Sequence, residues 1–255
     1  MGSKVRNSAS PPGWRYRAVA LAAGGALLAP AVPAWAGGPV SAANPVAAQA
    51  ASLIAPTTAK AAYAAAARPT LRQGAKGAAV VSLQQRLAAL HYDTGGADGT
   101  FGASTFHAVV AFQKVNGLGR DGIVGPRTWA ALDHPTMPKP RYQHSGYAME
   151  ANLSRQVLYL TRNGAVVRIL DASSGKSSTP TPTGNYHVTR RIDGWRQSAL
   201  GLLWRPNYFT GGYAVHGATS VPNYPASHGC VRVPIPAMNR LWGILKVGYP
   251  VHVYR

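Results

Sequence analysis

The spacing of apolar residues predicts a helical unit in the middle of the chain. Between residues 70 and 133, apolar positions recur every three or four residues on one helical face: Val80, Leu83, Leu87 and Leu90. A second helical face carries Thr105, Ala108, Val109 and Phe112. Pro126, a favourable first-turn residue, begins a third short helix that carries Trp129 and Leu132. We therefore expect residues 70–133 to form a small all-α domain.

An internal repeat supports this interpretation of the helical unit. Residues 98–106 read DGTFGASTF and residues 121–129 read DGIVGPRTW. Each copy is a glycine-rich turn that leads into a helix, so the same local device is used twice.

The apolar pattern changes beyond residue 146, where the period becomes two. Val157–Leu160 and Val166–Leu170 flank Asn163-Gly164, and Asn-Gly between β-rich runs is the strongest short hairpin signal. Further strand candidates are residues 185–189, 213–216 and 251–254, and a short helix is expected at 236–245. We expect residues 147–255 to form a mostly β domain, either a sandwich or an open barrel.

Three segments lie outside these two domains. Residues 1–36 have the features of a secretory signal peptide, with basic residues, an apolar run of about a dozen residues and a small-x-small cleavage site at Ala34-Trp35-Ala36. A permanent membrane anchor would need about 20 apolar residues, and glycines and prolines interrupt this run. Residues 37–69 are expected to be an Ala/Pro-rich linker, and residues 134–146, which hold three prolines, a short stiff linker.

The basic composition favours a polyanionic partner. Removal of the four basic residues in the signal peptide would leave 22 of the 26 lysines and arginines against 7 acids, a formal charge of +15. The positive residues are scattered among Gly, Pro and Thr, and the chain contains no recognisable nucleic-acid module, so nucleic acid is not the expected partner. An anionic wall polymer or membrane surface suits an exported protein better.

Cys230 is the only cysteine of the chain, so an exported protein of this sequence has no internal disulfide. It lies in the run ASHGCVR at residues 226–232, and His216 lies a short loop upstream. A thiol of ordinary pKa is only a few per cent ionised at neutral pH, so a cysteine nucleophile needs a neighbouring base, a positive field or both. His216, His228 and Arg232 can supply these. We expect such a thiol to alkylate well below pH 8.

The helical unit resembles a known family, the peptidoglycan-binding three-helix module. The resemblance covers nearly all of residues 70–132 and rests on short signatures that include Leu71-Arg72-Gln73-Gly74, Leu83-Gln84, Asp98-Gly99, Phe112-Gln113 and Asp121-Gly122. One difference is His91, where the family usually has glycine before the tyrosine. The resemblance implies binding to the glycan wall without locating the groove.

The C-terminal unit resembles the catalytic domain of L,D-transpeptidases, the YkuD-like cysteine enzymes that cross-link peptidoglycan. The resemblance covers residues 147–255 and rests on residues 152–160, on 174–184 and, most specifically, on VHG at 215–217 with SHGCVR at 227–232. Ten residues separate His216 from Ser227, which is shorter than is common in the family, and two prolines stiffen this loop. The expected architecture is thus a multi-domain chain, a small all-α binding domain followed by a mostly β catalytic domain.

The resemblance implies that Cys230 is the nucleophile and His216 the base that takes its proton. The carbonyl of Gly217 is then able to hold the imidazole through its other nitrogen, and no acidic third member is required. The amides around Gly229 and Cys230 are the natural oxyanion hole.

Three further residues of the motif are expected near the thiol. Ser227 is expected to fix the loop through its hydroxyl group. Arg232 either lowers the pKa of the thiol or holds a substrate carboxylate. A structural role and a catalytic role for His228 have equal weight, because a cysteine nucleophile needs only one base.

The implied reaction is acyl transfer between peptidoglycan stem peptides, through a thioester on Cys230, in the cell wall or periplasmic space of a bacterial envelope. No cofactor and no metal is implied. The main competing hypothesis is an L,D-carboxypeptidase that acts on the same substrate. The sequence is also compatible with a non-catalytic wall-binding protein, with a cysteine protease of another fold, and with a metal site at His216, His228 and Cys230, which zinc geometry disfavours.

Overall fold

A computed structural model describes residues 68–255 of the chain, all within one compact unit. The predicted signal peptide at 1–36 lies outside the described residues, as does the predicted linker at 37–69 except for its last two residues. None of the helices in residues 68–255 combines the length and the apolar character needed to cross a membrane.

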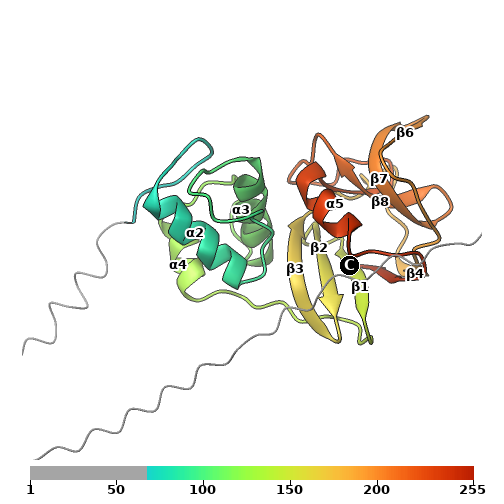
Figure 1. The fold of residues 1–255 in the computed structure, drawn as a ribbon, viewed down its shortest axis with the longest axis horizontal. Helices are drawn as coiled ribbons and strands as arrows, with labels where there is room; N and C mark the ends of the chain where they lie inside the picture. Colours follow the sequence, from blue (N-terminus) through green and yellow to red (C-terminus); the bar gives the residue numbers. More distant parts are fainter. Residues whose placement is uncertain (1–67) are drawn as a thin grey trace, which may run out of the picture. The chain divides into compact units, whose positions relative to one another are not determined.

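Three helices form the first part of the described chain, as the apolar spacing predicted (Figure 1). They are α2 (Ala78–Ala89), α3 (Ala103–Val115) and α4 (Pro126–Asp133). Each helix begins directly after a glycine, and Pro126 takes the first turn of α4. The predicted apolar faces are buried and form the core, with exposures of 1% or less for Val80, Leu83, Leu87, Val109, Phe112 and Leu132.

The internal repeat has a structural explanation in two buried glutamines. Gln84 Nε2 donates to Asp98 Oδ1 at 2.9 Å, and Gln84 Oε1 accepts the amide of Gly99 at 2.9 Å. Gln113 repeats the arrangement on the Asp121-Gly122 turn, at 2.7 and 2.8 Å. Both glutamine side chains have their polar atoms satisfied inside the core. The repeated Asp-Gly turns are therefore held from within by the preceding helix.

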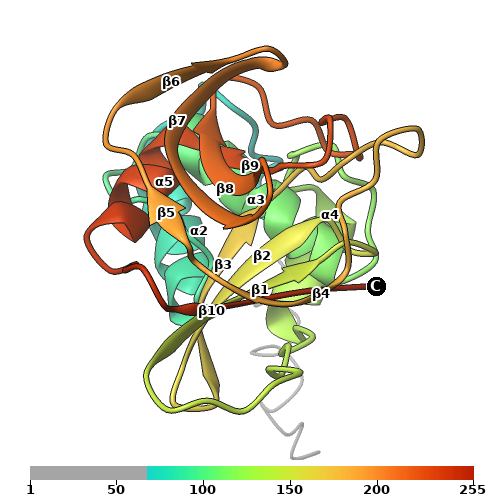
Figure 2. The ribbon, with the colours of Figure 1, turned by 90° about the vertical axis from the view of Figure 1, so that its right-hand side faces the viewer.

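The second part is mostly β, as predicted, and contains two sheets and one helix. The first sheet has the order β3-β2-β1-β10-β4 and consists of β1 (Tyr147–Asn152), β2 (Val157–Arg162), β3 (Ala165–Asp171), β4 (Gly184–His187) and β10 (Pro250–Tyr254). The second has the order β5-β7-β8-β9, with β6 paired to β7: β5 (Arg190–Arg191), β6 (Trp195–Ser198), β7 (Gly201–Thr210), β8 (Tyr213–Ala218) and β9 (Val231–Pro234). Helix α5 (Ile235–Trp242) follows β9 and packs on β7 and β8 (Figure 2).

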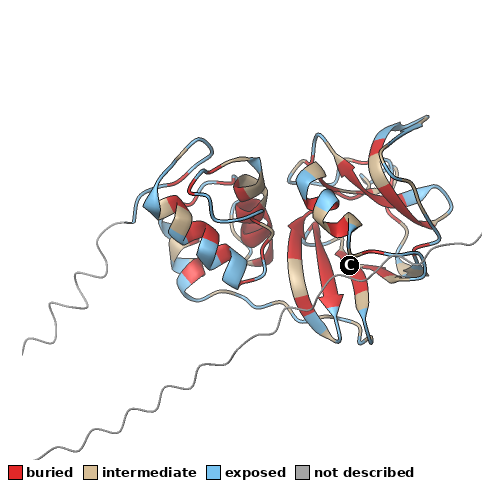
Figure 3. Ribbon diagram, viewed as in Figure 1, coloured by how far each residue is buried: buried red, intermediate tan, exposed pale blue. Residues whose placement is uncertain are grey.

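Strand β2 is buried on both faces, which explains its continuous apolar run. Leu158 and Leu160 belong to the core shared with the second sheet and α5. Val157 and Tyr159 belong instead to the core shared with the helices. Figure 3 shows β2 as an almost uninterrupted buried strand. The first sheet therefore contributes to two apolar cores at once.

The hairpin predicted at Asn163-Gly164 is confirmed, and another was missed. Strands β2 and β3 pair antiparallel, and the two turn residues have φ values of 49° and 74°, as a type I′ turn requires. The β6–β7 hairpin was not predicted because Pro206 interrupts β7, and proline argues against a regular strand. The strand accommodates it by an irregularity in which the pairing register shifts between Trp204 and Asn207.

The helical part docks on the edge strand of the first sheet. The amide of Ile169 in β3 donates to the carbonyl of His91 at 2.8 Å, and the amide of Asp93 donates to the carbonyl of Ile169 at 3.1 Å. These bonds cover backbone groups that an edge strand would otherwise leave open. His91, which differs from the family pattern, has a φ of 68°, a conformation that favours glycine.

Candidate active site

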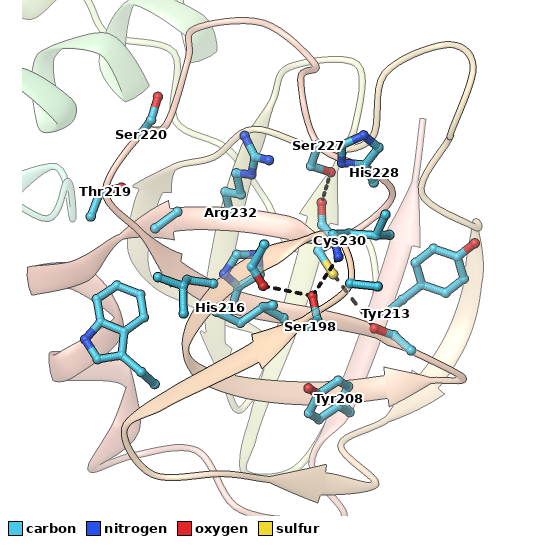
Figure 4. Close-up of a pocket in the computed structure, with 18 residues that line it drawn as sticks. Ser198, Tyr208, Tyr213, His216, Thr219, Ser220, Ser227, His228, Cys230 and Arg232 are labelled. Atoms are coloured by element: carbon cyan, nitrogen blue, oxygen red, sulfur yellow. Dashed lines mark hydrogen bonds between the residues drawn. The ribbon is translucent and has the colours of Figure 1, made fainter.

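The candidate base lies on β8 of the second sheet, and the only cysteine lies directly before the neighbouring strand β9. β8 carries His216, β9 begins directly after Cys230, and these parallel strands place His216 opposite Arg232. Because paired residues share a face and side chains alternate along a strand, the three side chains project to the same side of the sheet. All three line one cavity (Figure 4).

The cavity has a volume of about 750 Å³ and a lining of two chemical kinds. The β6–β7 hairpin supplies an apolar wall in which Trp195, Leu200 and Leu202 are 47%, 63% and 56% exposed. The rest of the lining includes the polar side chains of Thr219, Ser220, Ser227, His228 and Arg232. The described residues that line the cavity include no aspartate or glutamate. A bound group therefore meets hydroxyl, imidazole and guanidinium groups as well as exposed apolar side chains.

His216 is buried and is oriented by the main chain. Its Nδ1 lies 2.9 Å from the carbonyl oxygen of Gly217. A carbonyl can only accept, so Nδ1 carries the proton and Nε2 is the basic atom of the ring. Burial lowers the pKa of His216 from 6.5 to about 4; the Gly217 carbonyl opposes this shift and the charge of Arg232 adds to it. The imidazole is therefore neutral at physiological pH.

The thiol of Cys230 is also held in its neutral form. Burial raises the pKa of Cys230, and this outweighs the opposite effects of the Ala214 backbone and Arg232. The Sγ atom lies 3.9 Å from the carbonyl oxygen of Gly212. The pKa of the thiol therefore does not favour the alkylation well below pH 8 that the sequence predicts, because desolvation exceeds the positive field of Arg232. At neutral pH the pair consists of thiol and imidazole rather than thiolate and imidazolium.

Ser227 organises the turn that presents the cysteine. Its hydroxyl donates to the carbonyl of Cys230 and accepts the amide of Gly229 at 3.0 Å. Its own main chain is tied to a neighbouring segment, since its amide donates to Ser174 O and its carbonyl accepts the Lys176 amide, both at 3.0 Å. The turn is thus fixed from inside by a hydroxyl and from outside by backbone pairing.

Two glycines allow the close packing around this turn. Gly229 has a φ of 111°, and a Cβ built on it would lie 2.2 Å from the Tyr213 ring. A Cβ on Gly175 would lie 2.2 Å from the carbonyl oxygen of Thr179 and 2.9 Å from Gly229 Cα. Only glycine fits at either position, which gives a physical reason for the glycines in two of the sequence signatures.

The structure brings together the site residues singled out from the sequence. His216, Ser227, His228, Cys230 and Arg232 line the cavity, whereas Gly217 holds the imidazole and Gly229 packs beneath Tyr213. The apolar wall was not predicted, because the β6–β7 hairpin was not predicted, and Tyr213 was expected only as the first residue of a strand. The available signal was the pair of apolar runs at 202–204 and 208–209 on either side of the proline. Within residues 68–255, no three His, Cys, Asp or Glu side chains are grouped so as to hold a metal ion.

Two protein families match the chain. Residues 146–253 match the L,D-transpeptidase catalytic domain family, and residues 76–132 match the family described as a putative peptidoglycan binding domain. Both matches fall on the segments in which the motifs were found.

Individual proteins give similar results. A crystal structure of an L,D-transpeptidase from Xylanimonas cellulosilytica is 47% identical, with a TM-score of 0.69, over 72% of this chain and 97% of that chain. L,D-transpeptidase 1 of Mycobacterium tuberculosis is 30% identical over 40% of this chain and 48% of its own length. A probable N-acetylmuramoyl-L-alanine amidase from Bacillus licheniformis is 47% identical over 24% of this chain and 18% of its own length. The chain spans 57% or less of the length of the curated relatives that it matches first.

Proposed function

The chain belongs to the L,D-transpeptidase family and carries a peptidoglycan-binding domain, and from this we propose that it is a secreted enzyme that forms 3-3 cross-links between peptidoglycan stem peptides. The observation that supports this most directly is that His216 on β8 and Cys230, directly before the adjacent parallel strand β9, face one cavity, with His216 Nδ1 on the Gly217 carbonyl. This arrangement leaves Nε2 available as the base for the only thiol of the chain.

The first half of the reaction makes the acyl-enzyme. His216 Nε2 takes the thiol proton as Sγ of Cys230 attacks the carbonyl carbon between the third residue and the terminal D-Ala of a tetrapeptide stem. The new S–C bond forms, the C–N bond breaks, and D-Ala leaves with the proton returned by His216. Because the pKa values of both groups favour their neutral forms, proton transfer accompanies the attack and no ion pair is formed in advance.

The oxyanion of the intermediate requires donors that are not already engaged. The amide of Gly229 donates to the Ser227 hydroxyl, so it serves the turn itself. The amide of Cys230 is therefore the donor that we assign to the oxyanion. Because this amide belongs to the nucleophilic residue, its position relative to the attacking sulfur is fixed. A donor in a fixed position stabilises the charge that develops on the carbonyl oxygen.

The second half of the reaction transfers the acyl group to the amine of another stem. An amine attacks only as the free base, and a cavity whose described lining lacks carboxylates while containing Arg232 disfavours the ammonium form. His216 removes the proton that the nitrogen loses as the thioester breaks and the thiol is regenerated. Arg232 is also suited to hold a stem carboxylate. These features favour aminolysis over hydrolysis, which would make the protein an L,D-carboxypeptidase.

Secretion and wall attachment complete the proposal. The signal-like segment at 1–36 would carry the chain out of the cytoplasm. The positive charge of the remaining chain would hold it on anionic wall polymers, and the binding domain would hold it on the glycan. The enzyme would then act in the cell wall or periplasmic space without a permanent membrane anchor.

The deciding experiment is mass spectrometry of purified disaccharide-tetrapeptides after incubation with residues 37–255. The native protein should release D-Ala and give dimers joined between third-position residues, whereas Cys230→Ala and His216→Gln should give neither product. Release of D-Ala without dimers would identify a carboxypeptidase. If the native protein gives no product and both it and Cys230→Ala sediment with cell walls, the protein is a wall-binding protein without this activity.

A further inference from the structure

A pair of reciprocal hydrogen bonds joins the helical part to the loop between the candidate base and the nucleophile. The guanidinium of Arg120, in the turn between α3 and α4, donates to the main-chain carbonyl of Asn223 at 3.2 Å. The side-chain amide of Asn223 donates in return to the main-chain carbonyl of Arg120 at 2.6 Å. In this clasp each residue therefore holds the backbone of the other across 103 positions of sequence.

The loop that is held in this way forms part of the cavity wall. It runs from the end of β8 to the cysteine, and Thr219 and Ser220 near its start line the cavity (Figure 4). Pro222 and Pro225 restrict its backbone. A third contact lies beside the clasp, where the hydroxyl of Ser173 donates to the carbonyl of Tyr224 at 2.7 Å.

The cysteine end of the loop and its central segment are anchored by different contacts. The end near the cysteine is fixed within the β part, because Ser227 is bonded to Ser174, Lys176 and Thr179. The central segment is exposed and is held at Asn223 by Arg120 of the helical part and at the neighbouring Tyr224 by Ser173 of the β part. Loss of the clasp should therefore loosen residues 219–223, while Ser173 still holds Tyr224 and the Cys230 turn keeps its own anchors.

We propose that the clasp between Arg120 and Asn223 makes the peptidoglycan-binding domain a positioning element of the active site, which sets the wall of the cavity that receives the stem peptide. The stem peptide as substrate depends on the proposed function, whereas the contact between the clasp and the loop does not. Arg120 is a positioning residue that acts through the loop and does not take part in the bond changes. The short loop with its two prolines is then suited to being held by the helical domain through Arg120.

The test measures D-Ala release from disaccharide-tetrapeptide together with amide hydrogen exchange of residues 217–229. Arg120→Ala and Asn223→Ala should each raise KM three- to tenfold with kcat changed less than twofold, and should speed exchange in the loop. The double variant should be worse than either single variant, because each acceptor is a main-chain carbonyl and each single substitution therefore removes only one of the two hydrogen bonds. Arg120→Lys, which keeps the charge and one donor, should recover part of the loss.

Two controls separate positioning from other effects. Lys76→Ala removes the same charge from an exposed position of the helical domain and should leave KM and loop exchange unchanged. Iodoacetamide should alkylate Cys230 at the native rate in both clasp variants, since its turn keeps its own anchors. Native loop exchange in Arg120→Ala, or equal losses in Lys76→Ala, would overturn the proposal. If the native protein releases no D-Ala, the proposed function fails, and loop exchange still decides whether the clasp positions the loop.

Discussion

At the scale of single residues, the burial of His216 affects the free energy of unfolding as well as the chemistry of the site. Its pKa is about 4 in the folded protein against an ordinary 6.5, because burial disfavours the imidazolium. Between these two pH values the unfolded chain binds a proton that the folded protein does not, so the folded state is fully favoured above pH 6.5 and loses stability as the pH falls towards 4. The loss from this one residue is about 3 kcal/mol, at 1.36 kcal/mol per pKa unit.

Urea unfolding of the native protein and of His216→Gln, at pH 7.5 and at pH 4.5, measures this contribution. The native protein should lose more stability between the two pH values than the variant does. His252, whose pKa is also lowered to about 4, titrates in both proteins and cancels in the comparison. Equal losses in the two proteins would mean that burial does not lower the pKa of His216 in the folded state.

The site residues that sequence could identify share a local character. Short sequence motifs identified four of them, Cys230, His216, Ser227 and Gly229, because their chemistry or conformation depends on neighbouring residues in the chain. The engagement of the Gly229 amide by Ser227, and the rise of the thiol pKa, could not be predicted in this way. Both depend on how deeply the turn is buried, which is a property of the sheets packed around it.

At the scale of secondary structure elements, helices and strands with regular periodicity were predictable, and the irregular β7 was not. The apolar spacing predicted α2, α3 and α4 because each helix buries one continuous face. The β6–β7 hairpin breaks the pattern in two ways. It contains a proline and a register shift, and three of its large apolar residues, Trp195, Leu200 and Leu202, are exposed in the lining of a cavity.

We expect substitutions in the apolar wall of that hairpin to change KM for the substrate without changing the free energy of unfolding. Leu200 and Leu202 are more than half exposed, so Leu200→Ser/Leu202→Ser should change the free energy of unfolding by less than about 1 kcal/mol. Because both side chains line the cavity, the double variant should raise KM for disaccharide-tetrapeptide by about tenfold, as expected when a few buried methylene contacts are lost. Steady-state D-Ala release measures this directly.

The matched control is Val247→Ser, which alters an apolar side chain of similar exposure, 60%, outside the cavity lining. It should leave KM unchanged. A hairpin variant whose kinetics match those of Val247→Ser would show that the apolar wall does not contact the substrate.

At the scale of the whole molecule, the helical and β parts share a buried ion pair. Lys114 in α3 donates to Asp171 Oδ1 and to the carbonyl oxygens of Gln156 and Ala172, at 2.5, 3.0 and 2.8 Å. Neither side chain is more than 1% exposed. From sequence this lysine could not be distinguished from a solvated one, because the pattern of α3 does not show which side meets a second domain. Its burial indicates that the two parts form a permanent unit.

The ion pair predicts strong coupling between the two parts on unfolding. Lys114→Met and Asp171→Asn should each cost about 3–5 kcal/mol, because the first leaves the buried Asp171 with His107 alone and the second leaves the buried Lys114 without a carboxylate. The double variant should be less destabilised than the sum of the two, since neither buried charge remains. Calorimetry should show one transition for the native protein, as a core shared through Tyr92, Tyr159 and Ile169 implies, and two in the single variants. Two transitions in the native protein, with additive effects of the substitutions, would mean that the helical and β parts unfold independently and that the interface contributes little to either.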